Sequence, residues 1–368
     1  MKIGIVGLPN VGKSTLFNAL TKSYSAPAEN FPFCTIEPNV GIVDVKDPRM
    51  DALSEMSKTQ KIVYAHTEFV DIAGLVKGAS KGEGLGNKFL SHIREVDAIV
   101  QVLRHFNDSD IVHVEGGVDP LRDREIINTE LIFADLEQIE KNLPNLQKKA
   151  RISQNKDEKR TVEILEAIQK VLMEGKLANT IKSEFSSEDL KLIKSYNFLT
   201  LKPFIYALNI AQEDLANAEA LKKEFEKKLN APVAIVCVKL ESEMMEFSPE
   251  ERAEFLTELL ELHGDNPIPT LDDLIGLAFR QLGLMYYFTT GEKETRAWTI
   301  PVDSTAPQAA GAIHSDFEKG FIKAEVVSTD KLLEAGSWAK AKEKGLIRLE
   351  GKEYIVQDGD VIIFKFNV

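Results

Sequence analysis

The chain has 368 residues, of which 43% are hydrophobic and 28% charged, and its formal net charge at pH 7 is −13. This length predicts two or three domains. The acidic balance excludes nonspecific wrapping of nucleic acid by the whole surface, although a local basic patch remains compatible with RNA binding.

Two cysteines, Cys34 and Cys237, exclude a disulfide framework and a zinc-ligand spacing. We therefore expect a reduced, cytoplasmic setting, in which Cys34 is either a reactive thiol or a packed side chain. No apolar run reaches membrane-spanning length, so we expect no membrane partner.

A phosphate-binding loop stands near the start of the chain. Residues 7–15 read Gly-Leu-Pro-Asn-Val-Gly-Lys-Ser-Thr and match the pattern G-x-x-x-x-G-K-[S/T]. The apolar run at residues 2–6 predicts a buried strand before the loop, and residues 13–22 have the spacing of a helix after it. In such loops the lysine, here Lys13, reaches the β- and γ-phosphates, and the hydroxyl, here that of Ser14, binds Mg²⁺. The loop predicts a nucleoside triphosphate site.

Two further segments fit the switch regions of phosphate-loop GTPases. Residues 28–39 contain two prolines and predict a loop, in which Thr35 binds Mg²⁺ and the γ-phosphate unless it is only a surface threonine. A predicted strand at 67–70 leads into Asp71 and Gly74, which fit the motif D-x-x-G. The carboxylate would hold Mg²⁺ through water, and the glycine N–H would sense the terminal phosphate.

The glutamine that orients the attacking water in Ras-like GTPases is replaced by Leu75. Leucine cannot orient water, so the polar group must come from elsewhere or intrinsic hydrolysis must be slow. A third predicted strand at 98–103 leads towards His113, which is either a half-buried strand residue or a mobile side chain that replaces the glutamine. The glycine-rich segment 77–86 predicts a switch that orders when nucleotide binds.

The base-recognition motif N-K-x-D of GTPases is broken in this chain. A predicted strand at 203–209 ends in Asn209-Ile210-Ala211-Gln212. The aspartate of the motif accepts two hydrogen bonds from guanine, and the amide of Gln212 cannot reproduce that charged pairing, although it matches N6 and N1 of adenine. Ile210 also removes the lysine that packs beside the base, while Asn209 can still brace the phosphate loop. These residues favour adenine over guanine.

A long, nearly glycine-free stretch separates these motifs. Apolar residues recur at helical spacing from residue 122 to about 196, which predicts two long antiparallel helices with their tip near 153–157. Positive side chains gather at this tip: Lys148, Lys149, Arg151, Lys156, Lys159 and Arg160, against Asp157 and Glu158. A helical arm with a basic tip suits an RNA phosphate surface, and a merely solvated coiled coil is the equally good alternative.

The last third of the chain changes from helices to short strands. After a predicted strand at 233–238, residues 239–241 stand where GTPases place the last base-contacting loop. Two helices close the nucleotide domain, and a compact β-grasp-like module follows that carries no catalytic constellation. The helices are predicted at 249–263 and 271–282, and the module has strands at 285–289, 294–299, 321–327 and 361–366 and a short helix at 309–313.

Together these motifs resemble the YchF branch of the Obg-like ATPases, over essentially the whole chain. The segments that carry the resemblance are 7–15, 30–39, 71–87 and 113–120, with a C-terminal module like a TGS domain. The resemblance implies an α/β fold: a Ras-like phosphate-loop NTPase domain with an inserted antiparallel helical hairpin and a C-terminal β-grasp domain. The predicted division is a G domain at 1–121 and 201–282, a helical insertion at 122–200 and a TGS-like domain at 283–366.

The resemblance also implies hydrolysis of ATP in preference to GTP, with Mg²⁺ as cofactor and K⁺ as a further candidate ion, and binding to ribosomes and ribosomal RNA but not DNA. It implies that main-chain atoms of Ile210 contact adenine. Gln212 departs from the glutamate usual in the family, so its side-chain contribution to base choice stays open. The expected nucleotide contacts are Asn10, Val11, Gly12, Lys13, Ser14, Thr15, Asn209, Ile210 and Gln212; the expected Mg²⁺ ligands are Ser14, Thr35 and Asp71; the expected catalytic residues are Lys13, Gly74 and His113.

Three functions remain open at this point. The first is a ribosome-associated ATPase that acts as a nucleotide-dependent switch in translation or stress response. The second is an Obg-like GTPase, which the Asn209 to Gln212 segment disfavours. The third is a binding module gated by ATP, in which hydrolysis is incidental.

Overall fold

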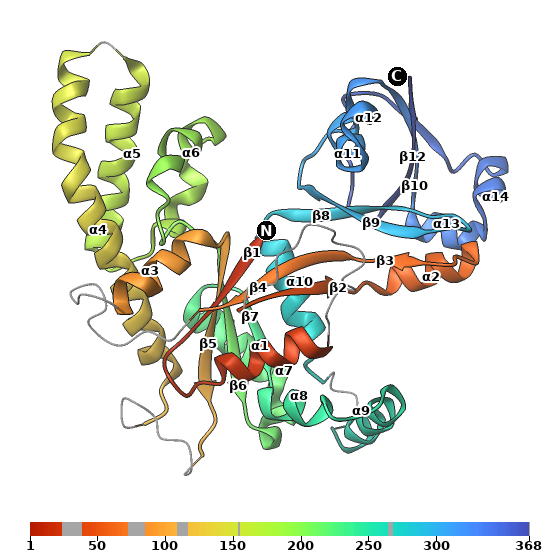
Figure 1. Ribbon diagram of the computed structural model, residues 1–368, viewed down its shortest axis with the longest axis horizontal. Helices are drawn as coiled ribbons and strands as arrows, with labels where there is room; N and C mark the ends of the chain where they lie inside the picture. The colour runs from red at the N-terminus through yellow and green to blue at the C-terminus, as the bar shows by residue number, and fades with distance from the viewer. Residues whose placement is uncertain (24–38, 73–84, 109–116, 154, 264–267, 368) are drawn as a thin grey trace. The chain divides into compact units, whose positions relative to one another are not determined.

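The computed structural model describes residues 1–23, 39–72, 85–108, 117–153, 155–263 and 268–367 (Figure 1). By their contacts the residues form two compact units, Met1–Gly41 with Glu68–Leu274 and Ile42–Thr67 with Ile275–Val368. The second unit therefore combines the C-terminal module with a segment from the first fifth of the chain, while the four-part division predicted from the sequence stays a prediction. None of the described helices combines the length and the apolar character that a membrane span requires.

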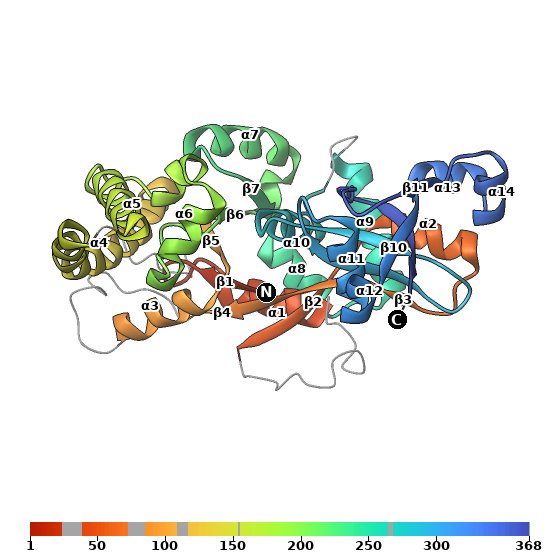
Figure 2. The same ribbon diagram turned by 90° about the horizontal axis from the view of Figure 1, so that it is seen from above.

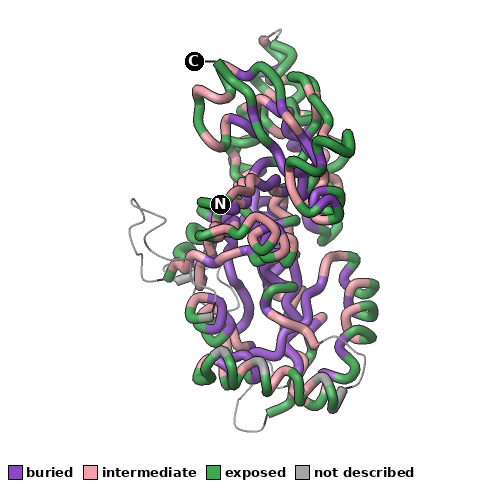
Figure 3. Tube along the Cα trace, turned by 90° about the vertical axis from the view of Figure 1, so that its right-hand side faces the viewer, coloured by how far each residue is buried: buried purple, intermediate pink, exposed green. Residues whose placement is uncertain are grey.

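The described residues form a first sheet of six strands in the order β2-β4-β1-β5-β6-β7. The strands are β1 (Lys2–Val6), β2 (Val40–Val45), β4 (Ala65–Asp71), β5 (Ala98–His105), β6 (Phe204–Ile210) and β7 (Val233–Val236). Strand β1 is parallel to β4 and β5, and β5, β6 and β7 continue in parallel. The largely apolar strands β1, β5, β6 and β7 are buried almost throughout, as parallel strands covered on both faces require (Figure 3). The carboxyl ends of these strands meet at one edge, where ligands bind in folds of this type.

Helices follow these strands along the chain, as the predicted phosphate-loop NTPase fold requires. They are α1 (Lys13–Ser23), α3 (Leu85–Glu95), α7 (Ala218–Leu229), α8 (Val238–Met244), α9 (Pro249–His263) and α10 (Leu271–Gln281). The predicted strand at 233–238 ends early, and residues 239–241 lie in α8 instead of a loop. The reason is that the side-chain oxygen of Asn209 accepts a hydrogen bond of 3.1 Å from Val238 N, which satisfies a donor at the start of the helix.

The predicted helical hairpin is present. Helix α4 (Pro120–Ile152) and helix α5 (Lys156–Met173) lie side by side in Figure 1 and Figure 2, and the turn at their tip falls within the predicted region. Asp119 caps α4 by accepting hydrogen bonds from two backbone N–H groups, and Asn155 caps α5. A 3₁₀ helix at Ala178–Glu184 and helix α6 (Ser187–Ile193) follow.

A buried carboxylate attaches the hairpin to the chain that returns to the sheet. Asp135 on α4 is inaccessible to solvent and accepts three hydrogen bonds: 3.1 Å from Leu199 N, 2.8 Å from Thr200 N and 2.7 Å from Thr200 Oγ1. Nearby, the Arg94 guanidinium at the end of α3 donates to the Gln138 side chain of α4 at 3.1 Å. The base of the hairpin is thus fixed by polar contacts as well as by packing.

The second unit contains a sheet in the order β11-β10-β12-β8-β9-β3. Its strands are β3 (Ile62–Val63), β8 (Leu284–Thr289), β9 (Thr295–Pro301), β10 (Phe321–Ser328), β11 (Arg348–Glu350) and β12 (Asp360–Phe366). Its helices are α2 (Pro48–Ser57), α11 (Ala306–Ile313), α12 (Ser315–Lys319), α13 (Thr329–Ala335) and α14 (Trp338–Glu343). Helix α11 packs its alanines onto the buried face of the sheet. The β-grasp fold predicted for the C-terminal module is confirmed.

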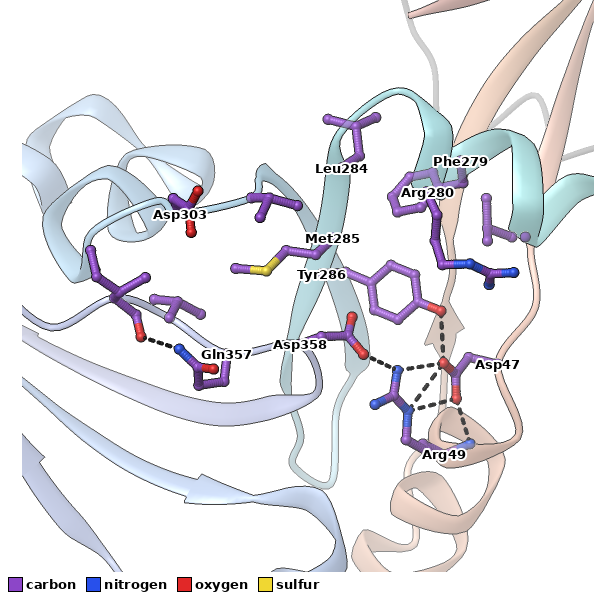
Figure 4. A pocket seen from close by; sticks show the side chains of 15 residues that line it. Asp47, Arg49, Phe279, Arg280, Leu284, Met285, Tyr286, Asp303, Gln357 and Asp358 are labelled. Atoms are coloured by element: carbon purple, nitrogen blue, oxygen red, sulfur yellow. Dashed lines mark hydrogen bonds and ion pairs between the residues drawn. The ribbon is translucent and has the colours of Figure 1, made fainter. Parts of the chain in front are cut away.

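An ion-pair cluster joins α2 to the β-grasp strands inside this unit, beside a cavity of about 570 Å³ (Figure 4). Asp47, which caps α2, accepts hydrogen bonds from Arg49 Nη2 at 2.8 Å and from Tyr286 Oη at 2.7 Å. Arg49 also pairs with Asp358 at 2.9 Å. Burial alone would raise the pKa of Asp47, but the hydrogen bonds from Arg49 and Tyr286 outweigh it and hold the pKa below its usual value.

We expect Asp47→Asn to destabilise the second unit by about 1–3 kcal/mol at pH 7, because it breaks charge-assisted hydrogen bonds in a buried setting. A carboxylate whose pKa is lower in the folded state contributes stability above its unfolded-state pKa and loses it as pH falls through the folded-state pKa. The difference between variant and wild type should therefore shrink in acid. Both tryptophans, Trp298 and Trp338, lie in this unit, so urea unfolding followed by their fluorescence at pH 7 and in acid measures it.

Asp303→Asn is the matched control, since Asp303 is exposed and its left-handed backbone suits asparagine equally well. An unchanged unfolding midpoint for Asp47→Asn at pH 7 would contradict the prediction.

Candidate nucleotide-binding site

The chain between β1 and α1 forms the phosphate loop predicted from the sequence. Gly7 lies where the loop passes β5, and a Cβ there would come within 2.9 Å of the Val102 carbonyl oxygen. Gly12 has a φ of +99°, and a Cβ there would come within 2.7 Å of the Asn209 side-chain nitrogen. Both glycines are therefore required by the backbone path itself. Helix α1 starts directly after the loop, so the unpaired N–H groups of its first turn add to the anion-binding character of this end.

Lys13 is the buried cation of the loop. Its side chain is 8% exposed, and its amino group donates a hydrogen bond of 2.7 Å back to the carbonyl oxygen of Leu8. Burial lowers the pKa of Lys13, and the nearby charge of Asp71 partly opposes this effect. A bound polyphosphate would supply the negative charge that favours the ammonium form.

Asn209 occupies the bracing position suggested by the sequence. Its amide nitrogen donates to the Val11 carbonyl oxygen at 3.0 Å, and its amide oxygen accepts from Val238 N at 3.1 Å. The side chain is 3% exposed. The buried amide of Asn209 therefore connects the phosphate loop to the C-terminal end of β6 and to the start of α8.

The residues at the end of β4 and in the first turn of α1 fit a Mg²⁺ ion. The Oδ1 atom of Asp71 is buried and accepts no hydrogen bond within the described part of the chain. A buried carboxylate oxygen without a donor is costly, and a cation is the partner that removes this cost. Ser14 is exposed at the start of α1. A hydroxyl and a carboxylate are the oxygen ligands that Mg²⁺ prefers.

Several predicted residues lie outside the described part of the chain. They are Thr35 with its neighbour Cys34, Gly74 and Leu75 of the second switch, and His113. Their roles stay predictions.

The base-recognition segment holds a contact that the sequence did not reveal. The amide nitrogen of Gln212 lies 3.0 Å from a carboxylate oxygen of Glu243 in α8. Because a carboxylate only accepts hydrogen bonds, Gln212 must present its NH₂ group to Glu243. Ile210, the predicted main-chain contact of adenine, is buried at the end of β6.

Comparison with known proteins covers the whole chain. The Bacillus subtilis protein named "Ribosome-binding ATPase YchF" is 51% identical over 99% of both chains. The Escherichia coli O157:H7 protein of the same name is 50% identical over all of this chain and 99% of its own. This chain belongs to the YchF family.

Structural and domain comparisons agree with membership of the YchF family. The solved structure titled "Structure of the Schizosaccharomyces pombe YchF GTPase" superposes with a TM-score of 0.84 at 39% identity, covering 99% of this chain and 97% of that one. The family described as "50S ribosome-binding GTPase" matches residues 2–149 of this YchF-family chain. The family named for the YchF C-terminal region, described as "Protein of unknown function (DUF933)", matches residues 284–367.

Proposed function

We propose that this YchF-family protein binds and hydrolyses ATP with Mg²⁺ and acts as a ribosome-associated, nucleotide-dependent switch. The observation that carries the proposal is the phosphate loop with its buried Lys13 near Asp71, whose buried Oδ1 atom has no hydrogen-bond donor among the described residues. The full-length relatives named ribosome-binding ATPases support the choice of activity and partner.

Each residue of the site has a role that its position allows. The loop N–H groups and the Lys13 amine hold the β- and γ-phosphates, and the Asn209 brace keeps the loop in shape. Bound Mg²⁺, held by Ser14 and Asp71 with Thr35 as a further ligand, would neutralise charge on the phosphate oxygens. Gly74 would sense the terminal phosphate.

Hydrolysis needs a group that orients water, since Leu75 cannot do so. We assign this role to His113, whose neutral imidazole can accept a proton or hydrogen bond near pH 7.

Base choice is tested by calorimetric titration with non-hydrolysable ATP and GTP analogues in Mg²⁺. We expect the ATP analogue to bind at least about tenfold more tightly, because a site without the guanine-pairing carboxylate leaves guanine donors unpaired. Gln212 carries an amide in place of that carboxylate, and its NH₂ group is already hydrogen-bonded to Glu243. Equal affinities, or a preference for the GTP analogue, would overturn the proposed ATPase in favour of an Obg-like GTPase.

The tip of the α4–α5 hairpin is the surface that we assign to ribosomal RNA. Five basic side chains there are exposed, and none of them makes an ion pair or hydrogen bond with another described residue: Lys148, Lys149, Arg151, Lys156 and Lys159. Arg160 differs, because it pairs with Asp189 and Glu163. Lys156 and Lys159 lie in the first turns of α5, where positive charge opposes the helix dipole. Helix stability therefore does not explain their presence, whereas contact with phosphate does.

Replacing Lys156 and Lys159 by glutamine should weaken ribosome binding and flatten its salt dependence. Each lost phosphate contact lowers the slope of log K against log salt by about 0.7–0.9. Cosedimentation with ribosomes at several salt concentrations measures both quantities. The matched control replaces Lys223 and Lys227, two exposed lysines of α7, by glutamine. If the tip variant and the control variant weaken ribosome binding equally, the salt dependence comes from overall charge, and the proposed RNA contact at the tip is wrong.

A further inference from the structure

Arg104 is a buried arginine at the end of β5, next to the phosphate loop. Its side chain is 1% exposed, although a guanidinium is strongly disfavoured in the interior without hydrogen-bond partners. Its three nitrogens donate to three backbone carbonyls: Nε to Phe106 at 3.1 Å, Nη2 to Asp108 at 3.3 Å and Nη1 to Asn10 at 3.5 Å. The guanidinium also lies 4.4 Å from the centre of the Phe106 ring. The group is held in one orientation by these contacts.

Strand register places Arg104 beside Asn209. The two residues are paired across β5 and β6, at the edge of the sheet where the phosphate loop passes. Asn209 binds the carbonyl of Val11, and Arg104 binds the carbonyl of the preceding residue, Asn10. Two consecutive carbonyls of the loop are thus held by a matched pair of buried side chains.

The carbonyl held by Arg104 belongs to a residue with an unusual backbone. Asn10 has a φ of +63°, in the left-handed region that non-glycine residues rarely adopt. Such a conformation persists where the surroundings determine it. Turning carbonyls towards the sheet directs the intervening N–H groups the other way, which is the arrangement that forms an anion-binding concavity.

We propose that Arg104 is a positioning residue of the phosphate site: together with Asn209 it fixes the loop so that its N–H groups face the β-phosphate. The ligand class is a di- or triphosphate with its divalent cation. This inference rests on the proposed nucleotide site, but it concerns the phosphates and not the base. Among the described residues, Lys13 and Arg104 are the buried cations that contact this loop, so Arg104 also adds positive potential there.

The test is Arg104→Lys, titrated calorimetrically with Mg²⁺-pyrophosphate, ADP and adenosine. Lysine keeps the charge, but its donors all sit on one nitrogen, so it cannot span the three carbonyls that the planar guanidinium reaches from three separate nitrogens. We expect about a tenfold loss of affinity for pyrophosphate and for ADP, with adenosine affinity unchanged. A general loss of structure would weaken adenosine binding as well. Arg94→Lys is the matched control, since Arg94 also donates to a backbone carbonyl, that of Asn197, away from the loop, and it should leave all three affinities unchanged.

A second variant covers the case in which Arg104→Lys does not fold. Phe106→Leu keeps the guanidinium and its charge but removes the ring that lies against it. We expect a smaller loss for pyrophosphate in the same direction, about threefold. Unchanged pyrophosphate affinity in a folded Arg104→Lys protein, or an equal loss for adenosine, would overturn the role of Arg104. If the wild-type protein prefers guanine nucleotides, the proposed ATPase fails, whereas the pyrophosphate result still decides the role of Arg104.

Discussion

Lys13→Ala should abolish nucleotide binding, with an affinity loss of at least about 100-fold for ATP. The amino group is buried, and its pKa is lowered because the interior disfavours its charge. This energetic cost is recovered when a polyphosphate pairs with the ammonium, and an interaction between charged groups in a partly buried site is worth several kcal/mol. Calorimetric titration with an ATP analogue in Mg²⁺ measures the loss.

The control for this prediction separates binding from turnover. His113→Ala should slow hydrolysis while ATP binding stays normal, because the imidazole is proposed to act on water and not on the phosphates. Normal ATP affinity in Lys13→Ala would contradict the proposed site. Unchanged turnover in His113→Ala, with ATP bound normally, would remove the histidine from the mechanism.

Asp135→Ala should lower the stability of the first unit by about 3–5 kcal/mol, because several buried hydrogen-bond donors, each worth about 1–3 kcal/mol when left unsatisfied, lose their common acceptor. The change leaves the N–H groups of Leu199 and Thr200 and the Thr200 hydroxyl without their acceptor. Urea unfolding followed by circular dichroism at 222 nm, which reports the helices of the hairpin, measures the effect. Glu140→Ala, an exposed position on the same helix, should leave the midpoint unchanged.

The pH dependence of the free energy of unfolding tests whether the Asp135 carboxyl group itself titrates on folding. Burial raises the pKa of Asp135 despite the opposing hydrogen bonds from Thr200 and Leu199 and the charge of Arg94. Because the folded-state pKa lies above the unfolded-state value, folding takes up a proton between the two, and stability falls as pH rises through that interval. Asp135→Asn should remove this slope. A slope that persists in Asp135→Asn would assign it to another group.

Local patterns were enough to predict the parts of the fold that lie close together in sequence. The strand–loop–helix unit around Lys13 and the long hairpin with its tip near residue 155 follow from apolar spacing within one segment. The sequence predicts no helix or strand for residues 42–66, and it gives no sign that they join the C-terminal module, because β3 has only two residues and its partner β9 is more than 200 positions away. Short strands with distant partners carry no local signal.

The site shows the same limit. Lys13 and Asp71 were found because their motifs are contiguous, and Asn209 because its motif has a fixed place after a strand. Arg104 and Glu243 were missed as contributors, since their partners, Asn10 and Gln212, come from other strands and loops. The available hint for Arg104 was a charged residue near the end of a largely apolar strand.

The intertwined second unit restricts how this protein can be dissected. Removing everything after Leu282 looks like a clean deletion of one module, but β3 would lose its partner β9, and Thr59 would lose its hydrogen bonds to Gly291 and Thr295. Helix α2 would equally lose the Asp47–Tyr286 contact at its cap. A truncated protein would therefore carry an unpaired strand edge and an exposed helix face between the two switch segments, a setting that favours aggregation. Loss of ATPase activity in such a truncation would report damage to residues 42–67 and not a regulatory role of the C-terminal module.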